Sequence, residues 1–78
     1  MTVSVEVFGQ LLPGEERCYT LTTDYPNEDP MKVQDAALLL GLKLEEVGLI
    51  TINGVQSEMR DLLTDECRLC FFPYLSGG

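Results

Sequence analysis

The stretch RLCFFPYLSGG, residues 68–78, combines the pattern of a strand with a short tail. Successive side chains of a strand point to opposite faces, so Leu69 and Phe71 would share one face while Cys70 and Phe72 share the other. The proline that follows has no N–H to donate and would end the pairing. The stretch therefore predicts a final strand and then a tail that finishes in Gly-Gly and a free carboxylate.

Two more strands are predicted near the N-terminus. Val3, Val5 and Val7 alternate with polar residues, which indicates a half-buried strand whose valines face the core. The sequence LPGE at 12–15 has proline and glycine in the positions that a type II turn requires. Residues 18–23 are rich in β-forming residues, so they predict a second strand and a hairpin.

One main helix is predicted over residues 33–40, where apolar residues recur at i, i+3, i+4 and i+7. Its start is open between Lys32, a poor cap, and an earlier start at Asp29, which precedes a proline. Leu38 and Leu39 widen the apolar arc. We therefore expect this helix to be largely covered.

Further strands are predicted in the second half of the chain. Residues 49–52 read as a third strand, and Asn53-Gly54 directly after it is a strong hairpin signal, since both residues tolerate positive φ. Residues 55–57 would return as a short edge strand. The following segment is polar and irregular, with Leu62 and Leu63 predicted to fill the core.

This order of elements predicts an α+β domain, because one helix can cover only one face of a sheet. We expect a mixed sheet of four to five strands with the helix on one face and the first and last strands at its centre. With 78 residues, the chain is one domain. We expect the globular part to span residues 1–73 and a flexible tail to span 74–78.

The charge balance restricts the partners. Five basic and 13 acidic residues give a net charge of −8, which disfavours binding to nucleic acid or to an anionic membrane. A basic patch on another protein is the better match, although the charge could serve solubility alone. The chain has no apolar run long enough to cross a bilayer. Three cysteines, an odd number, fit a reducing compartment, so we expect a cytoplasmic protein.

Catalytic and metal-binding residues are not evident in the sequence. There is no histidine, no glycine-rich phosphate loop, and no nucleophile with a base near it in sequence. Cys67 and Cys70 are three residues apart and would point to opposite faces of a strand, and a zinc site would also need Cys18. Packing as small apolar side chains is the favoured interpretation of these cysteines. Cys70, on the outward face, is the best candidate for a reactive thiol.

The carboxylate of Gly78 is the remaining group with usable chemistry. A carboxylate must be activated before it can be attacked, and adenylation by ATP is the common route. Glycine suits a narrow channel because it has no Cβ and accepts φ of either sign. Five residues after Pro73 can extend at most about 17 Å, enough to enter a neighbouring active site. The alternative is a frayed terminus without a role.

The chain resembles the ubiquitin-like β-grasp sulfur carriers, which include the molybdopterin synthase small subunit (MoaD) and the thiazole-synthesis carrier (ThiS). The likeness covers nearly the whole chain. Its most specific part is the ending, which is similar to the Phe-Pro-Pro-Val-x-Gly-Gly ending of the family. The similar stretches are residues 33–38, 40–42, 52–54, 63–65 and 72–78.

The resemblance implies a mechanism and partners. A MoeB/ThiF-like adenylating enzyme would use ATP and Mg²⁺ to adenylate Gly78, and sulfur from a persulfide would displace AMP to leave a thiocarboxylate. The sulfur would then pass to an acceptor such as the molybdopterin synthase large subunit. The chain itself would bind no cofactor and would not be an enzyme. Sulfur carriage for thiamin thiazole or tRNA thiolation, and conjugation to proteins through Gly78, remain alternatives, as does an interaction module with an idle tail.

The resemblance also assigns site residues. The tail that enters the partner would comprise Gly77, Ser76 and Leu75, and the docking residues would be Phe72, Pro73 and Tyr74. Phe72 could equally be a cross-strand packing residue at the sheet surface.

The chain departs from the family pattern at four places. Tyr74 replaces a second proline, Glu66 replaces a turn glycine, Lys32 replaces a threonine-type cap, and the loop at 24–31 is long. None of these departures touches the Gly-Gly.

Overall fold

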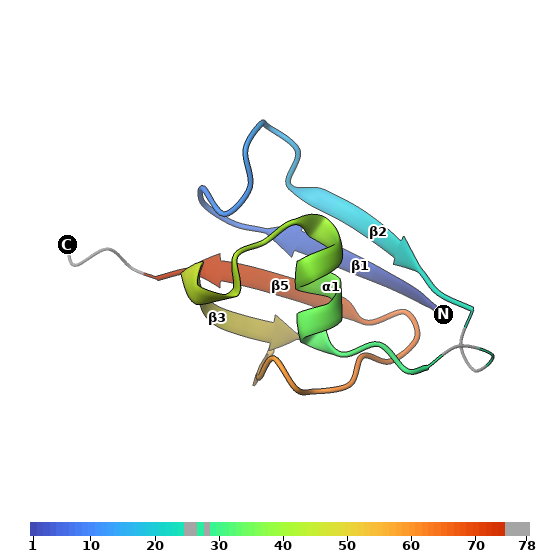
Figure 1. Cartoon of the computed structure of the whole chain (residues 1–78). Helices are drawn as coiled ribbons and strands as arrows, with labels where there is room; N and C mark the ends of the chain where they lie inside the picture. Colours follow the sequence, from blue (N-terminus) through green and yellow to red (C-terminus); the bar gives the residue numbers. More distant parts are fainter. Residues whose placement is uncertain (25–26, 28, 75–78) are drawn as a thin grey trace.

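A computed structural model describes residues 1–24, 27 and 29–74, and its elements follow the predicted order (Figure 1). The predicted tail residues 75–78 lie outside the described residues. No helix within the described part of the chain is long and apolar enough to cross a membrane. The elements are β1 (Thr2–Val7), β2 (Cys18–Thr22), α1 (Val33–Leu40), the 3₁₀ turn η1 (Leu44–Glu46), β3 (Val47–Ile52), β4 (Val55–Ser57) and β5 (Arg68–Pro73).

The five strands form one mixed sheet in the order β2-β1-β5-β3-β4. β1 and β5 run parallel in the middle of the sheet, with Val5 beside Leu69 and Val7 beside Phe71. The other neighbours are antiparallel. Because β1 and β5 are parallel, their C-terminal ends meet at the same end of the sheet, where the chain leaves β5 (Figure 1).

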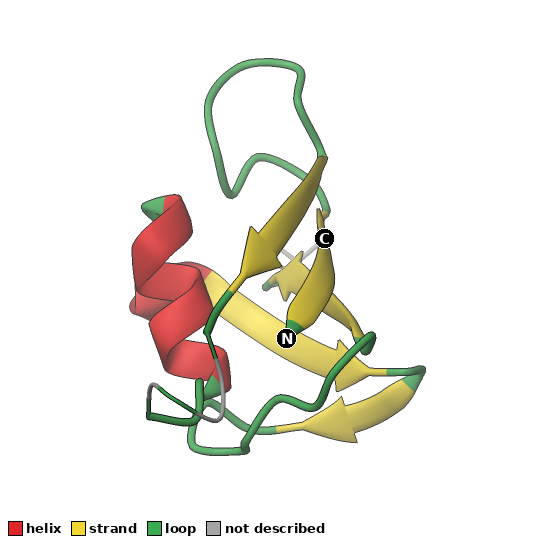
Figure 2. Ribbon diagram, turned by 90° about the vertical axis from the view of Figure 1, so that its right-hand side faces the viewer, coloured by secondary structure: helices red, strands yellow, loops and turns green. Residues whose placement is uncertain are grey.

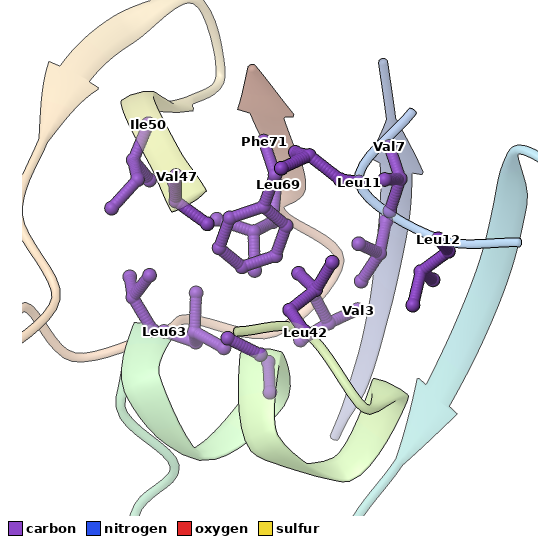
Figure 3. Packing of buried hydrophobic residues seen from close by; sticks show 14 of the residues in the cluster. Val3, Val7, Leu11, Leu12, Leu42, Val47, Ile50, Leu63, Leu69 and Phe71 are labelled. Carbon is purple, nitrogen blue, oxygen red and sulfur yellow. The ribbon is translucent and has the colours of Figure 1, made fainter. Parts of the chain in front are cut away.

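The helix α1 lies on one face of the sheet, so the domain has two layers (Figure 2). We call the face under α1 the inner face and the opposite one the outer face. The valines of β1 and the residues Leu69 and Phe71 of β5 point toward the helix and are at most 2% exposed. On the helix, Val33, Ala36 and Ala37 belong to the same buried cluster. Figure 3 shows part of this cluster, with Val3 and Val7 of β1 and Leu69 and Phe71 of β5 labelled. This is the α+β, ubiquitin-like β-grasp architecture, and the predicted core faces of the first and last strands are confirmed.

The helix spans the predicted residues 33–40 and differs from the prediction only in its exposure. Of the two starts left open, the structure has Lys32 as the N-cap, and the carboxylate of Asp35 accepts a hydrogen bond from the Lys32 N–H at 2.9 Å. The Asp35 carboxylate thus satisfies the N–H of the cap residue, and the Asp35 N–H, for which the lysine side chain has no acceptor, donates to the Lys32 carbonyl at 3.0 Å. The expectation that the helix is largely covered was wrong: Leu38 is 61% exposed and Leu39 66%. Both leucines lie beside the helix face that points away from the sheet. No other element of the described chain covers that face.

The connections hold the strands in register. Asn53 and Gly54 both have positive φ, at 52° and 82°, which confirms the predicted hairpin. Asn53 also accepts a hydrogen bond from the Arg68 N–H at 2.9 Å, which ties the turn to β5. Of the two leucines predicted to fill the core, Leu63 is buried, whereas Leu62 is 54% exposed.

Glu66 marks the entry to β5. Its φ is 61°, in the left-handed region that glycine tolerates best. The Glu66 N–H donates to the Thr2 carbonyl at 2.7 Å, and the Asp65 carboxylate accepts from the Thr2 N–H at 2.8 Å. Two hydrogen bonds to β1 therefore hold this turn in a conformation that costs a non-glycine residue about 1–2 kcal/mol.

Candidate functional site

The candidate site is the end of the outer face where the chain leaves β5. Most outward residues of β1 and β2 are polar and exposed, including Thr2, Ser4 and Thr20. The polarity changes at the C-terminal ends of β1 and β5. There the outer face carries an apolar patch of Phe8, Leu49, Phe72, Pro73 and Tyr74, which we name the docking patch after the role predicted for Phe72, Pro73 and Tyr74.

Phe8 and Phe72 form the aromatic centre of the docking patch. Their rings stack with centroids 4.5 Å apart and planes inclined by 7°. The Phe8 N–H donates to the Phe71 carbonyl at 2.9 Å, which continues the pairing of β1 with β5 by one residue. Phe72 is half-buried and stacks on Phe8 across the two strands, so the packing interpretation is confirmed, while its role in docking stays a prediction.

The other side of the docking patch comes from β3. Leu49 pairs with Phe72 in the strand register and is 39% exposed, and Tyr74 is 65% exposed. Together with Gly48 and Pro73 they line a hollow of about 350 Å³. Its walls are largely apolar, so burying this surface against a partner would be favourable.

Two glycines lie against the residues that lead into the tail. We call Pro73 and Tyr74 the tail root. Gly48 lies in β3 at an irregularity of its pairing with β5, and Gly9 follows β1 with a φ of 66°. A Cβ on Gly48 would lie 2.8 Å from the Tyr74 Cα, and a Cβ on Gly9 would lie 2.7 Å from the Pro73 Cγ. Both positions leave no room for a larger residue.

The segment that precedes Val47, the strand partner of Pro73, carries a net negative charge. Glu45 and Glu46 of η1 are exposed, as is Lys43 directly before η1. With a net charge of −8 for the chain, this end of the molecule favours a partner surface that is basic around an apolar centre.

A second hollow, of about 320 Å³, lies beside Ser4 on the polar part of the outer face. It includes the ion pair between Arg68 and Glu6, which joins β5 to β1. Glu6, and to a lesser degree Cys70, raises the pKa of the Arg68 guanidinium above its ordinary value, so Arg68 stays charged. The ion pair takes up two of the three charged side chains that line this hollow, and the third is Glu66.

The three cysteines are free thiols. Cys67 is 1% exposed and packs in the core, as predicted for a small apolar side chain. Cys18 and Cys70 both pair with Glu6, one from each side, so an entire strand separates them on the sheet. Within the described residues, no group of three or more His, Cys, Asp or Glu side chains is placed to hold a metal ion.

Of the predicted site residues, the structure brings Phe72, Pro73 and Tyr74 together in the docking patch. Leu75, Ser76, Gly77 and Gly78 lie outside the described residues. Sequence reasoning missed Phe8, Leu49, Gly9 and Gly48. The alternation of β1 extended by one residue would have placed Phe8 outward, and a glycine near the start of a strand is a signal for a bulge or a close backbone approach.

Comparison with known proteins supports the fold. No protein-family model matches the chain, and a comparison with curated protein sequences finds no match. SAMP1 from Haloferax volcanii has a similar structure, with a TM-score of 0.74, 21% identity and full coverage of both chains. A chain in the complex of subunits 1 and 2 of molybdopterin-converting factor from Helicobacter pylori is also similar, with a TM-score of 0.62, 21% identity and full coverage of both chains. The chain shares the β-grasp fold of these proteins.

Proposed function

We propose that this protein is a sulfur carrier whose C-terminal carboxylate is activated by a partner enzyme. The observation that carries the proposal is the position of the docking patch. On an outer face that is mostly polar along β1 and β2, the large apolar side chains gather where the chain leaves β5. A partner that binds this patch would receive the chain terminus at its own active site.

The proposed reaction begins at the Gly78 carboxylate. One carboxylate oxygen attacks the α-phosphate of ATP, and pyrophosphate leaves to give an acyl-adenylate. A persulfide sulfur then attacks the acyl carbon and AMP leaves. A second thiol cleaves the resulting acyl disulfide, which releases the thiocarboxylate and forms a disulfide on the donor side. ATP and Mg²⁺ belong to the MoeB/ThiF-like partner, and this chain acts as its substrate.

The acceptor that we propose is the large subunit of a molybdopterin synthase. The fold is shared with a chain from a two-subunit complex of molybdopterin-converting factor, which supports a partner of that kind. The Phe-Pro ending with its terminal Gly-Gly supports the same choice. The three free thiols suit the reducing conditions of the cytoplasm, where we place this exchange.

Mass spectrometry tests the proposal. The full chain is incubated with ATP, Mg²⁺, a candidate adenylating enzyme and a persulfide donor. We expect one oxygen of the C-terminal glycine to be replaced by sulfur, with the change located by fragmentation. The control variant lacks Gly78 and still ends in a free carboxylate on Gly77. Modification of that variant to the same extent would contradict the proposal.

Conjugation to other proteins through Gly78 is the second candidate. The similarity in fold to SAMP1 favours testing it, since the activated carboxylate could be attacked by a lysine amine instead of sulfur. Isopeptide-linked conjugates in an extract, lost when Gly78 is deleted, would support this function. Their absence alongside thiocarboxylate formation would leave sulfur carriage as the function.

A further inference from the structure

We infer that Gly9 and Gly48 are positioning residues that fix the direction in which the C-terminal tail leaves the domain. Where the inference concerns the partner enzyme, it rests on the proposed function. The two glycines come from different parts of the chain, one after β1 and one in β3. Each meets a different part of the tail root, so together they confine Pro73 and Tyr74 from two sides.

Because Gly48 has no Cβ, the main chain of the tail root can lie directly against β3. A Cβ at this position would lie 2.8 Å from both the N and the Cα of Tyr74 and 3.0 Å from the carbonyl carbon of Pro73. All three are backbone atoms, so no side-chain rotation could relieve the contact. The pairing of β3 with β5 is also irregular between Val47 and Leu49, which places Gly48 at a bulge.

Gly9 acts on the proline ring. A Cβ here would lie 2.7 Å from the Cγ and 3.3 Å from the Cδ of Pro73. The ring is rigid and cannot turn away as a long side chain would. Gly9 also has a φ of 66°, so its missing side chain serves both the turn after β1 and the contact with Pro73.

Tyr74 is the part of the tail root that would yield to a larger residue at position 48. Val47 is buried in the core and pairs with Pro73, and Leu49 pairs with Phe72, so β3 is held on both sides of Gly48. Tyr74 is exposed and follows the last residue of β5. A change of direction of about 20° at the root would move the far end of an extended five-residue segment by about 6 Å.

Nuclear magnetic resonance tests the inference without any partner. In the full-length protein we expect nuclear Overhauser effects between Tyr74 and Leu49, whose side chains line the same hollow. In Gly48→Ala these effects should weaken or vanish, while the contacts between Val5 and Leu69 in the core remain. An unchanged position of Tyr74 in the variant would overturn the inference.

Adenylation kinetics test its consequence for the partner. We expect Gly48→Ala to lower kcat for adenylation about tenfold, because a terminus that is misplaced by even 1 Å reacts slowly. KM should rise by a smaller factor than kcat falls, since the stacked pair of Phe8 and Phe72 stays in place while Tyr74, which also belongs to the docking patch, moves. Unfolding measurements on the same variant exclude loss of the fold as the cause. An unchanged kcat would contradict the assignment.

A matched pair of variants tests Gly9. Gly14 also has a positive φ, at 84°, but a Cβ there would meet no atom within 4 Å. Gly9→Ala and Gly14→Ala therefore share the backbone cost, and only Gly9→Ala should slow adenylation. Adding Pro73→Ala, which removes the opposing ring atoms, should recover part of the rate lost in Gly9→Ala. Equal rates for the two glycine variants, or strict additivity with Pro73→Ala, would overturn the role of Gly9.

The failures of the two proposals can be told apart. If the wild-type chain accepts neither adenylate nor sulfur, the proposed function fails, and the magnetic resonance measurement still decides whether the glycines set the direction of the tail. If the wild-type chain is modified and Gly48→Ala is modified at the same rate, the proposed function stands and the positioning role fails.

Discussion

The inner and outer faces of the sheet use apolar residues differently. On the inner face, the apolar side chains of β1 and β5 run the length of both strands and are covered by α1. On the outer face, the described side chains are mostly polar along β1 and β2, and the aromatic pair of Phe8 and Phe72 lies at one end. The helix therefore accounts for the inner pattern, whereas nothing within the described chain accounts for the outer one.

Along the single strand β5, this difference allows the effect of a side chain on stability to be measured separately from its effect on the proposed binding to a partner. In β5, Leu69 and Phe71 are fully buried, while Cys70 and Phe72 are only partly so. Removing an inner side chain leaves a cavity under the helix, and removing an outer one leaves a gap on an accessible surface. Substitutions at neighbouring positions should therefore affect different measurements.

The largest effect is expected for Phe71→Ala. Phe71 is fully buried at the centre of the core, and its loss should lower the free energy of unfolding by about 3–5 kcal/mol. A chain of this length is expected to have a total of roughly 4–12 kcal/mol. Urea denaturation followed by circular dichroism measures the change. A loss under about 1 kcal/mol would mean that the inner face is not the core described above.

The neighbouring change, Phe72→Ala, should act mainly on the partner. Loss of the stacked pair should cost about 1 kcal/mol of stability. The KM for adenylation should rise at least tenfold, since an aromatic anchor at the centre of an interface contributes about 2 kcal/mol.

Thr51→Ala is the matched control for Phe72→Ala. Thr51 is half-buried and lies on the outer face, on the same strand as Leu49 but outside the docking patch. Its replacement should leave the KM for adenylation unchanged. If both variants bound the partner as the wild-type chain does, the outer face would not be the recognition surface.

The inner face could be predicted from the sequence because it follows a strict period. The valines of β1, the alternation in β5 and the Asn53-Gly54 turn are local signals, and each gave the correct element. The outer site depends on which strand ends meet. Phe8 and Phe72 are neighbours because β1 and β5 are parallel, and no local pattern states that pairing.

The two positioning glycines and the exposed leucines also depend on tertiary structure. Position 48 requires glycine because the main chain of Tyr74, just after β5, lies against it. The residues that surround Gly48 in the sequence give no sign of this contact. Leu38 and Leu39 fit an apolar helix by spacing, but a domain with one helix has no layer to cover its outward side. Periodicity predicts which residues can be buried, and the number of layers decides how many of them are.

Substitution of the exposed helix leucines tests the comparison of the inner and outer faces through a smaller expected effect. Leu38→Gln and Leu39→Gln should each change the free energy of unfolding by no more than about 0.5 kcal/mol, since both side chains are already largely in water. The rate of adenylation should not change, which would distinguish these leucines from the docking patch. A large rise in KM in either variant would show that the partner also contacts the helix.

The smallest effect is expected for Glu6→Gln on the polar part of the outer face. The substitution keeps the shape of the side chain and removes the charge that pairs with Arg68. Arg68 stays protonated in the variant, because the Glu6 carboxylate only raises a guanidinium pKa that is high already. The urea midpoint should fall slightly at low salt and match the wild-type midpoint near 1 M salt, where the Debye length is about 3 Å. A difference that persists at high salt would show that the pair is shielded from solvent. The polar part of the outer face would then be covered by another molecule in solution. The outer face would in that case have a second contact surface besides the docking patch.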